Sequence, residues 1–196
     1  ADLWDIMSDS PRVPRADEIS NALSYVDDSQ VVLDEEAGTV FLTRPGISLD
    51  LGALVKGYAA GKAREIYLEN GVESALLSLG GMVVTVGERP DGQPFSIGLR
   101  DPEGSASDLY GTLAADGRII STSGGYERYF EQDGQIYHHI LDPRTGYPAD
   151  SGLLSVTVLC GDGMQADFLS TYLFIAGEDA VREHLNETDY SVIAVT

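Results

Sequence analysis

Basic residues are scarce in this chain. Only 12 of its 196 residues are Lys or Arg, against 32 Asp or Glu, which gives a formal net charge of −20 at pH 7. Nucleic-acid affinity comes largely from Lys and Arg that neutralise phosphates, so nucleic acid and anionic membranes are poor candidates as partners. A phosphate-bearing ligand would need locally concentrated positive charge, from a divalent cation, a few fixed basic side chains or a helix N-terminus. The charge therefore favours a metal-dependent site.

Cysteine and long apolar runs are also nearly absent. The single Cys160 cannot form an internal disulfide, and it ends the apolar run 153–159, which predicts a buried strand residue. No run is long and apolar enough to span a bilayer, and no signal peptide is visible. Because the opening Ala1-Asp2-Leu3-Trp4 is typical of the middle of an element, we expect a longer parent polypeptide. With 43% hydrophobic residues, residues 1–196 are expected to form one domain.

Hydrophobic periodicity and turn residues predict helices mixed with mainly hairpin-connected strands, which indicates an α+β fold of mainly antiparallel sheet with packed helices. Strand 110–114 is expected to pair with strand 118–121 across a turn at Asp116-Gly117. Helix 54–68 should present Val55, Ala59, Ala63, Ile66 and Tyr67 as its apolar face. The predicted helices are 14–24, 54–68, 164–176 and 178–185, and the predicted strands are 30–33, 39–43, 74–79, 83–86, 95–99, 110–114, 118–121, 126–132, 135–141, 153–160 and 191–195.

Two oxygen-bearing side chains share one face of the helix predicted at 164–176. Asp167 and Thr171 are four residues apart, so both can contribute oxygens to one hard cation, and Ser170 is adjacent. Most pairs at this spacing simply form a solvated helix face. Here the neighbours of Asp167 are mostly apolar, which predicts that the carboxylate is buried.

The adjacent His138 and His139 lie in a predicted strand, so they point to opposite faces and only one can serve a given site. The turn after them begins at Asp142, whose carboxylate can cap the backbone, which makes a purely structural role about as plausible as a ligand role. Arg144 and Thr145 could supply anion contacts beside the histidine.

Glycines and lysines near residues 52–62 superficially suggest a phosphate loop, but the spacing does not match one. The remaining interpretation is that small residues let a helix start approach a ligand closely, with Lys56 supplying charge. Gly80-Gly81 and the run 121–125, with its Ser and Thr hydroxyls, offer similar close backbone approach.

Seven blocks in one order carry a resemblance over nearly the whole chain. Together they resemble the ApbE family of flavin transferases (FAD:protein FMN transferases), which implies an ApbE-like fold related to the T-fold. The blocks are Leu3-Trp4, 48–59, 78–81, 98–102, 121–129, 139–148 and 166–171.

The resemblance implies Mg²⁺-dependent cleavage of the FAD pyrophosphate, with FMN passed to a Thr or Ser hydroxyl of an acceptor redox protein and AMP released. It places His139 nearest the chemistry, as either base or acid. Magnesium prefers oxygen ligands and retains substrate phosphate, which suits an acidic protein. The implied magnesium ligands are the Ala53 backbone oxygen, Asp167, Ser170 and Thr171, and the implied FAD contacts are Asp50, Lys56, Ser121, Thr122, Ser123, His139 and the backbone at Leu141.

Two departures from the family pattern matter. Met82 follows Gly80-Gly81 where relatives usually have Asn or Asp, and relatives carry a region before Leu3-Trp4 that supplies part of the flavin cradle. The alternatives are therefore an FAD pyrophosphatase that releases FMN and AMP, a flavin-binding protein without turnover, and, more distantly, a hydrolase using Ser123, His139 and Asp142. The resemblance also implies an exported, lipid-anchored parent protein, and it leaves the acceptor and the oligomeric state open.

Overall fold

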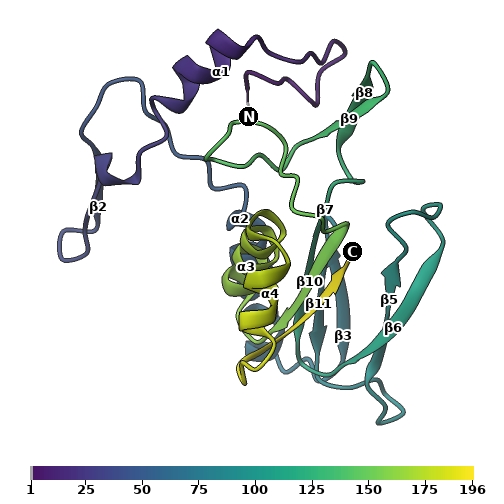
Figure 1. The fold of residues 1–196 in the computed structure, drawn as a ribbon. Helices are drawn as coiled ribbons and strands as arrows, with labels where there is room; N and C mark the ends of the chain where they lie inside the picture. Colours follow the sequence, from purple (N-terminus) through teal and green to yellow (C-terminus); the bar gives the residue numbers. More distant parts are fainter. Residues whose placement is uncertain (1) are drawn as a thin grey trace. The chain divides into compact units, whose positions relative to one another are not determined.

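The computed structural model describes residues 2–196, and the predicted domain 1–196 also includes Ala1, which lies outside them. The chain divides into two compact units, each built from two stretches of sequence. The first unit contains residues 2–50 and 127–149, and the second contains residues 51–126 and 150–196. Helices and antiparallel strands occur together, so the predicted α+β class is confirmed (Figure 1).

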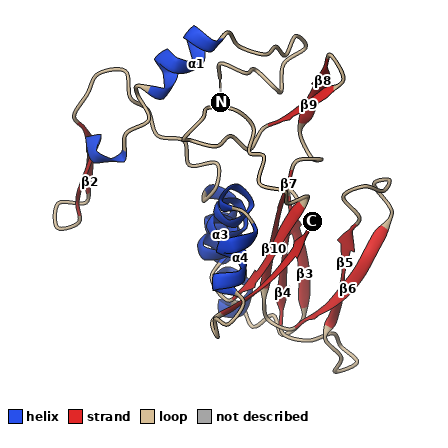
Figure 2. Cartoon of the chain, in the orientation of Figure 1, coloured by secondary structure: helices blue, strands red, loops and turns tan. Residues whose placement is uncertain are grey.

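The second unit is built on a five-stranded antiparallel sheet with the order β11-β10-β7-β4-β3. Its helices cover one face, where α2 packs on β4, and α3 packs on β7 and β10. The hairpin β5–β6 covers the other face. Figure 2 shows these three layers as helices, sheet and hairpin. The strands are β3 (Ala75–Leu79), β4 (Met82–Val86), β5 (Phe95–Arg100), β6 (Leu109–Ala115), β7 (Ile119–Gly124), β10 (Ser155–Cys160) and β11 (Tyr190–Val195), and the helices are α2 (Val55–Glu69), α3 (Gly163–Ala176) and α4 (Glu178–His184).

Alternation along the central strands produces two apolar layers. Val84, Ile119 and Val158 are fully buried, and strand alternation places Ser121 and Ser123 on the same face as Ile119. On the opposite face, Ile120 packs with Ile97 and Ala115 of the hairpin. Cys160 is buried on β10, as predicted.

One predicted pairing is wrong. β6 does not pair with β7 across Asp116-Gly117; it pairs with β5, whereas β7 pairs with β4 and β10. The physical reason is burial. The first three residues of β7 are all buried, as expected of a central strand covered on both faces, whereas most of β6 is exposed. The residues of the Asp116-Gly117 turn did not by themselves show whether the two strands pair with each other or belong to different layers.

The first unit packs around Trp4, which is 1% exposed. Its indole Nε1 donates a hydrogen bond to the Gly146 carbonyl oxygen at 2.9 Å, and the rings of Tyr137 and Tyr147 lie 5.5 Å from it. Ile19 of α1 packs against Gly146, where a Cβ atom would lie 2.7 Å from its Cγ2. The elements of this unit are α1 (Ala16–Leu23), the short 3₁₀ helix Asp28–Gln30, β1 (Val31–Asp34), β2 (Thr39–Leu42), β8 (Tyr129–Gln132) and β9 (Gln135–His138).

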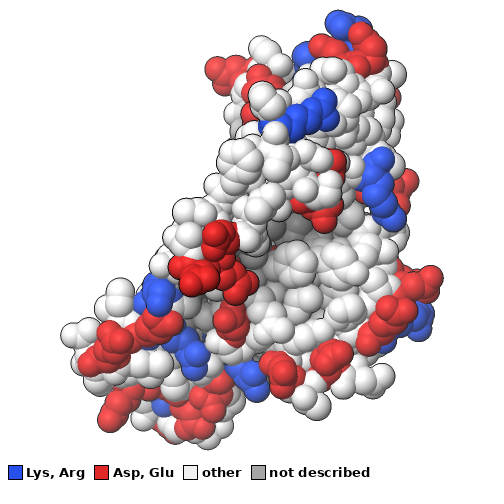
Figure 3. All heavy atoms as spheres, turned by 90° about the vertical axis from the view of Figure 1, so that its left-hand side faces the viewer, with Lys and Arg blue, Asp and Glu red and all other residues white. Residues whose placement is uncertain are grey.

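Acidic side chains outnumber basic ones at the surface. Figure 3 shows Asp and Glu spread over one face of the molecule, with fewer Lys and Arg among them. Within residues 2–196, each helix falls short of the length and apolar content needed to cross a bilayer.

Candidate functional site

Asp167 lies in the second turn of α3 and is 1% exposed, as its apolar neighbours predicted. Both of its carboxylate oxygens have partners from the beginning of α2. The Lys56 ammonium lies 2.9 Å from Oδ1, and the Gly57 backbone N–H donates to Oδ2 at 2.9 Å. The side chain of Lys56 is 41% exposed, so it reaches from solvent to a carboxylate that solvent does not reach. The two helical segments that the site requires therefore meet within the second unit.

The first turn of α2 lacks a side-chain cap of its own. Its N-cap residue is Leu54, and the Asp167 carboxylate satisfies the Gly57 N–H instead. A carboxylate at this position also benefits from the positive end of the helix dipole. Gly57 is the third residue of α2, so its N–H is one of the donors that have no partner inside the helix. Ala53 precedes the N-cap residue, so its carbonyl lies outside the hydrogen-bond ladder of α2.

Two glycines permit this close approach of α2 and α3. A Cβ atom at Gly57 would lie 2.1 Å from the Gly163 carbonyl oxygen, and one at Gly163 would lie 2.2 Å from that of Gly57. The small residues near the start of α2 predicted that this helix start approaches a ligand closely. For Gly57 this is wrong, because its open side is filled by the backbone of α3. Gly163 was not predicted as a site residue, and only its position at a helix start could have indicated it.

The predicted apolar face of α2 is also wrong. Val55 and Ile66 are 55% and 56% exposed, whereas Gly57 and Ala60 are buried. Helices that meet through glycine backbones bury their smallest residues, because larger ones would hold the axes apart. The helix itself is confirmed, with its bounds within one residue of those predicted.

Four hydroxyl groups form a connected row beside Asp167. Ser123 Oγ lies 3.0 Å from Ser170 Oγ and 3.1 Å from Thr171 Oγ1, and Ser121 Oγ lies 3.2 Å from Ser170 Oγ. Ser170 and Thr171 in turn donate to the Asp167 carbonyl oxygen at 3.0 and 3.2 Å. Strand β7 and helix α3 thus face each other with hydroxyls, which joins two of the predicted segments.

Thr122 does not join this row. It lies on the opposite face of β7, where its hydroxyl is 2.8 Å from Thr157 Oγ1 on β10. Met82 is 1% exposed at the start of β4, so it serves the core. The Gly80-Gly81 turn before it has positive φ at both residues, and a Cβ at Gly80 would lie 4.0 Å from Lys56 Cδ. The turn therefore lies beside the lysine side chain.

The donor set of the second unit fits a magnesium ion. One buried carboxylate, two hydroxyls of α3 and one backbone carbonyl are all oxygen ligands of the kind that Mg²⁺ prefers. Among residues 2–196, no three His, Cys, Asp or Glu side chains gather into a metal-binding group. A magnesium ion here would thus have a single carboxylate and would need further oxygens, which substrate phosphates commonly supply.

His139 lies in the first unit, directly after β9. Its backbone N–H donates to the Arg128 carbonyl oxygen at 3.1 Å, and its ring Nδ1 lies 3.3 Å from the same oxygen. A carbonyl can only accept, so this contact places the ring proton on Nδ1 and makes Nε2 the basic nitrogen of the neutral ring. His138 uses a different partner, because its Nε2 lies 3.1 Å from the Ala149 carbonyl oxygen. The two rings therefore contact different carbonyl groups.

Leu141 and Asp142 organise the loop that follows. Leu141 forms an isolated bridge with Pro148, and β9 ends at His138 and not at Leu141 as predicted. The Asp142 carboxylate accepts from the Arg144 backbone N–H at 2.8 Å and from its guanidinium at 2.7 Å. These hydrogen bonds, above all those from the guanidinium, lower the pKa of Asp142. Asp142 is therefore a structural residue of the turn.

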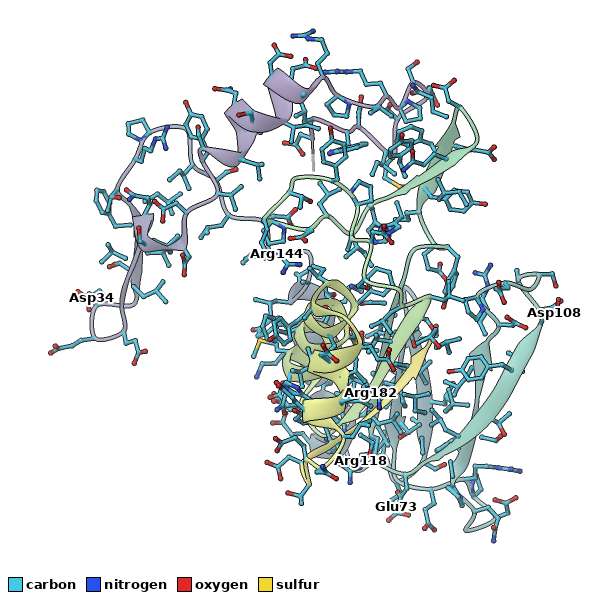
Figure 4. All side chains as sticks on the ribbon, viewed as in Figure 1. Asp34, Glu73, Asp108, Arg118, Arg144 and Arg182 are labelled. Atoms are coloured by element: carbon cyan, nitrogen blue, oxygen red, sulfur yellow. The ribbon has the colours of Figure 1, made fainter. Side chains whose placement is uncertain are left out.

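The remaining predicted residues of the first unit are placed as follows. Arg144, labelled in Figure 4, is directed to Asp142, and its side chain is 72% exposed. Asp50 is exposed in the segment before α2. The hydrolase alternative loses its support, because Arg144 engages the Asp142 carboxylate and two other hydroxyls engage Ser123.

Comparison with known proteins identifies the family. The ApbE family model matches residues 1–195. An FAD:protein FMN transferase of Klebsiella pneumoniae (strain 342) is 46% identical over 175 residues, which is 89% of this chain and 54% of that protein. One from Treponema pallidum (strain Nichols) is 35% identical over 188 residues, covering 89% of this chain and 52% of that protein. The chain thus spans about half the length of these relatives.

Solved structures support the same family assignment. The ApbE protein of Thermotoga maritima superposes with a TM-score of 0.88 at 36% identity, covering 99% of this chain and 63% of that one. The flavinyl transferase ApbE of Pseudomonas stutzeri, in its apo form, superposes with a TM-score of 0.77 at 28% identity, covering 100% of this chain and 64% of that one.

Proposed function

This chain belongs to the ApbE family, and on that basis we propose that it transfers FMN from FAD to a Thr or Ser hydroxyl of an acceptor protein, with Mg²⁺ and with release of AMP. In this reaction the acceptor oxygen forms a bond to the FMN phosphorus. The phosphoanhydride bond to AMP breaks, and the acceptor hydroxyl loses its proton.

The single observation that supports the metal-dependent part is the buried carboxylate of Asp167 between the start of α2 and the hydroxyl row. In the proposal, Asp167, Ser170, Thr171 and the Ala53 carbonyl hold Mg²⁺. When bound, the ion would neutralise developing charge on the pyrophosphate oxygens. This contribution matters in a protein whose net charge of −20 repels a dinucleotide.

The proposed FAD contacts are inferred from the charge and position of the residues. The Lys56 side chain is 41% exposed and its ammonium lies 2.9 Å from the Asp167 carboxylate, so it can pair with a phosphate oxygen. Ser121 and Ser123 stay in the proposal as residues behind the metal ligands, and Asp50 and the Leu141 backbone as flavin contacts. Thr122, on the other face of the sheet, no longer has geometric support.

His139 supplies the proton chemistry in this proposal. Its contact with the Arg128 carbonyl leaves Nε2 as the nitrogen that can accept the acceptor proton. The same nitrogen, once protonated, can assist the departing AMP.

The test incubates the protein with FAD, Mg²⁺ and a peptide that carries one Thr, followed by mass spectrometry. The expected result is a peptide heavier by one FMN, with AMP released in equal amount and both products lost when the metal is chelated. AMP and free FMN without a labelled peptide would identify a pyrophosphatase. Retained FAD with no AMP would identify a flavin-binding protein.

We also propose, from the family resemblance alone, that the parent protein is exported, lipid-anchored and acts on an extracytoplasmic redox protein. Cell fractionation with an antibody to this chain is the test. Recovery of the protein in the cytoplasm would reject this location and leave the chemistry untouched.

A further inference from the structure

The hydroxyl row contains one member that contacts both proposed hydroxyl ligands. Ser123 on β7 lies within hydrogen-bonding distance of Ser170 Oγ and Thr171 Oγ1, at 3.0 and 3.1 Å. We propose that Ser123 is a positioning residue, which orients the Thr171 hydroxyl so that a lone pair faces the cation. This inference rests on the proposed function, because it assumes a divalent cation at Asp167.

Each hydroxyl has one proton to donate, and this fixes the direction of the hydrogen bonds along the row. Ser170 uses its one hydroxyl proton to donate to the Asp167 carbonyl oxygen at 3.0 Å. Ser123 donates its own proton to Ser170, so towards Thr171 it can only accept. The single Thr171 hydroxyl proton is therefore shared between two acceptors, Ser123 Oγ at 3.1 Å and the Asp167 carbonyl oxygen at 3.2 Å. A hydroxyl whose proton is held on the protein side presents its lone pairs to the other side, as a metal ligand must.

Burial makes this orientation persistent. Ser170 is fully buried and Ser121 is 3% exposed, so water competes little at the Ser170 end of the row, whereas Ser123 and Thr171 are half-buried. Ser121 lies 3.2 Å from Ser170 Oγ, whereas Ser123 lies within hydrogen-bonding distance of both Ser170 and Thr171, which makes Ser123 the bridge between the two ligands. Groups that orient metal ligands in this way typically contribute tenfold to a hundredfold in metal affinity.

Ser123→Ala removes the bridge, and Ser123→Thr restores a hydroxyl at the same atom. The matched control is Ser155→Ala. Ser155 is a buried serine, 2% exposed, on the neighbouring strand β10, and strand alternation places its side chain on the opposite face of the sheet. The control makes the same chemical change on the other face of the sheet, without touching the hydroxyl row.

The experiment titrates the protein with Mn²⁺, a substitute for Mg²⁺, and follows the free ion by electron paramagnetic resonance without flavin. We expect Ser123→Ala to weaken Mn²⁺ binding about tenfold, while Ser155→Ala and Ser123→Thr stay within about twofold of the unmodified protein. Thermal unfolding without metal measures the structural loss in each alanine variant, so that it can be separated from the loss of Mn²⁺ affinity. If Ser123→Ala does not fold, Ser123→Cys keeps the volume with a weakly bonding thiol and should show the same loss.

Unchanged Mn²⁺ affinity in the folded Ser123 variants would overturn the positioning role and leave the proposed function standing. If Ser155→Ala weakens binding as much as Ser123→Ala, the effect belongs to the sheet and the positioning role is rejected. If the unmodified protein binds no Mn²⁺, the metal site fails, and both proposals fail with it.

Discussion

Two buried aspartates, one in each unit, are held in opposite ways. Asp142 obtains its partners from within its own turn, because the Arg144 backbone and guanidinium lie two residues away. Asp167 obtains its partners from a helix that begins more than a hundred residues earlier in the chain. A carboxylate with local partners stabilises a loop, whereas one with distant partners also joins two helices and can expose an oxygen-rich site between them. This difference supports the proposal that Asp167, and not Asp142, takes part in the chemistry.

Asp167→Asn should produce the largest effect. The amide keeps the shape but removes the charge that a cation requires, so flavinylation should fall by about a thousandfold, equivalent to several kcal/mol of lost charge stabilisation. The measurement is peptide labelling against Mg²⁺ concentration, with Asp142→Asn as the control in the other unit. An Asp167→Asn protein with the original Mg²⁺ dependence would refute the ligand assignment.

His139→Ala tests whether the first unit contributes chemistry at all. Loss of a general base or acid typically costs at least about a hundredfold in turnover, whereas FAD binding should change little. Turnover by mass spectrometry and FAD binding by fluorescence separate the two quantities. His138→Ala is the control, because its ring bonds a different carbonyl, that of Ala149. An equal loss in both variants would show that the effect comes from the fold of the loop.

Gly57→Ala should weaken the junction of α2 and α3. The new methyl group would lie 2.1 Å from the Gly163 carbonyl oxygen, so the helices must separate, at a cost of at least about 2 kcal/mol in the free energy of unfolding. Gly61→Ala, one turn later in α2, meets nothing within 4 Å and should stabilise the protein by up to about 1 kcal/mol. Urea unfolding of both variants measures the contrast, and equal effects would contradict the close packing.

Asp142→Asn should have the smallest effect, and one that depends on pH. The carboxylate of Asp142 has a pKa below its ordinary value of 3.8, so its charged form stabilises the folded state above that value. This contribution is lost as the pH falls through the lowered pKa. The variant should therefore be less stable by about 1 kcal/mol at neutral pH, because the Arg144 partner is largely exposed. The gap should close as the pH falls below 3.8 and through the lowered pKa of Asp142; a gap independent of pH would exclude the charge as its cause.

The sequence by itself determined the features whose causes are local. Periodicity located all four α-helices, turn residues located most hairpins, and the apolar neighbours of Asp167 predicted its burial. Turn chemistry offered a structural role for Asp142 as one of two equally plausible roles, and its hydrogen bonds to Arg144 favour that one. The resemblance to the ApbE family rested on ordered motifs, and the family comparison confirmed it.

Only the tertiary structure decided which distant groups meet. It separated Thr122 from Ser121 and Ser123, because adjacent strand residues point to opposite faces. It placed β7 at the centre of the sheet and β6 in a separate hairpin, since pairing depends on which strands are buried on both faces. It also brought Gly57 against Gly163, a contact between backbones that no periodicity encodes. The physical reason is the same in each case: these arrangements minimise the free energy of packing between segments, and that energy depends on both partners at once.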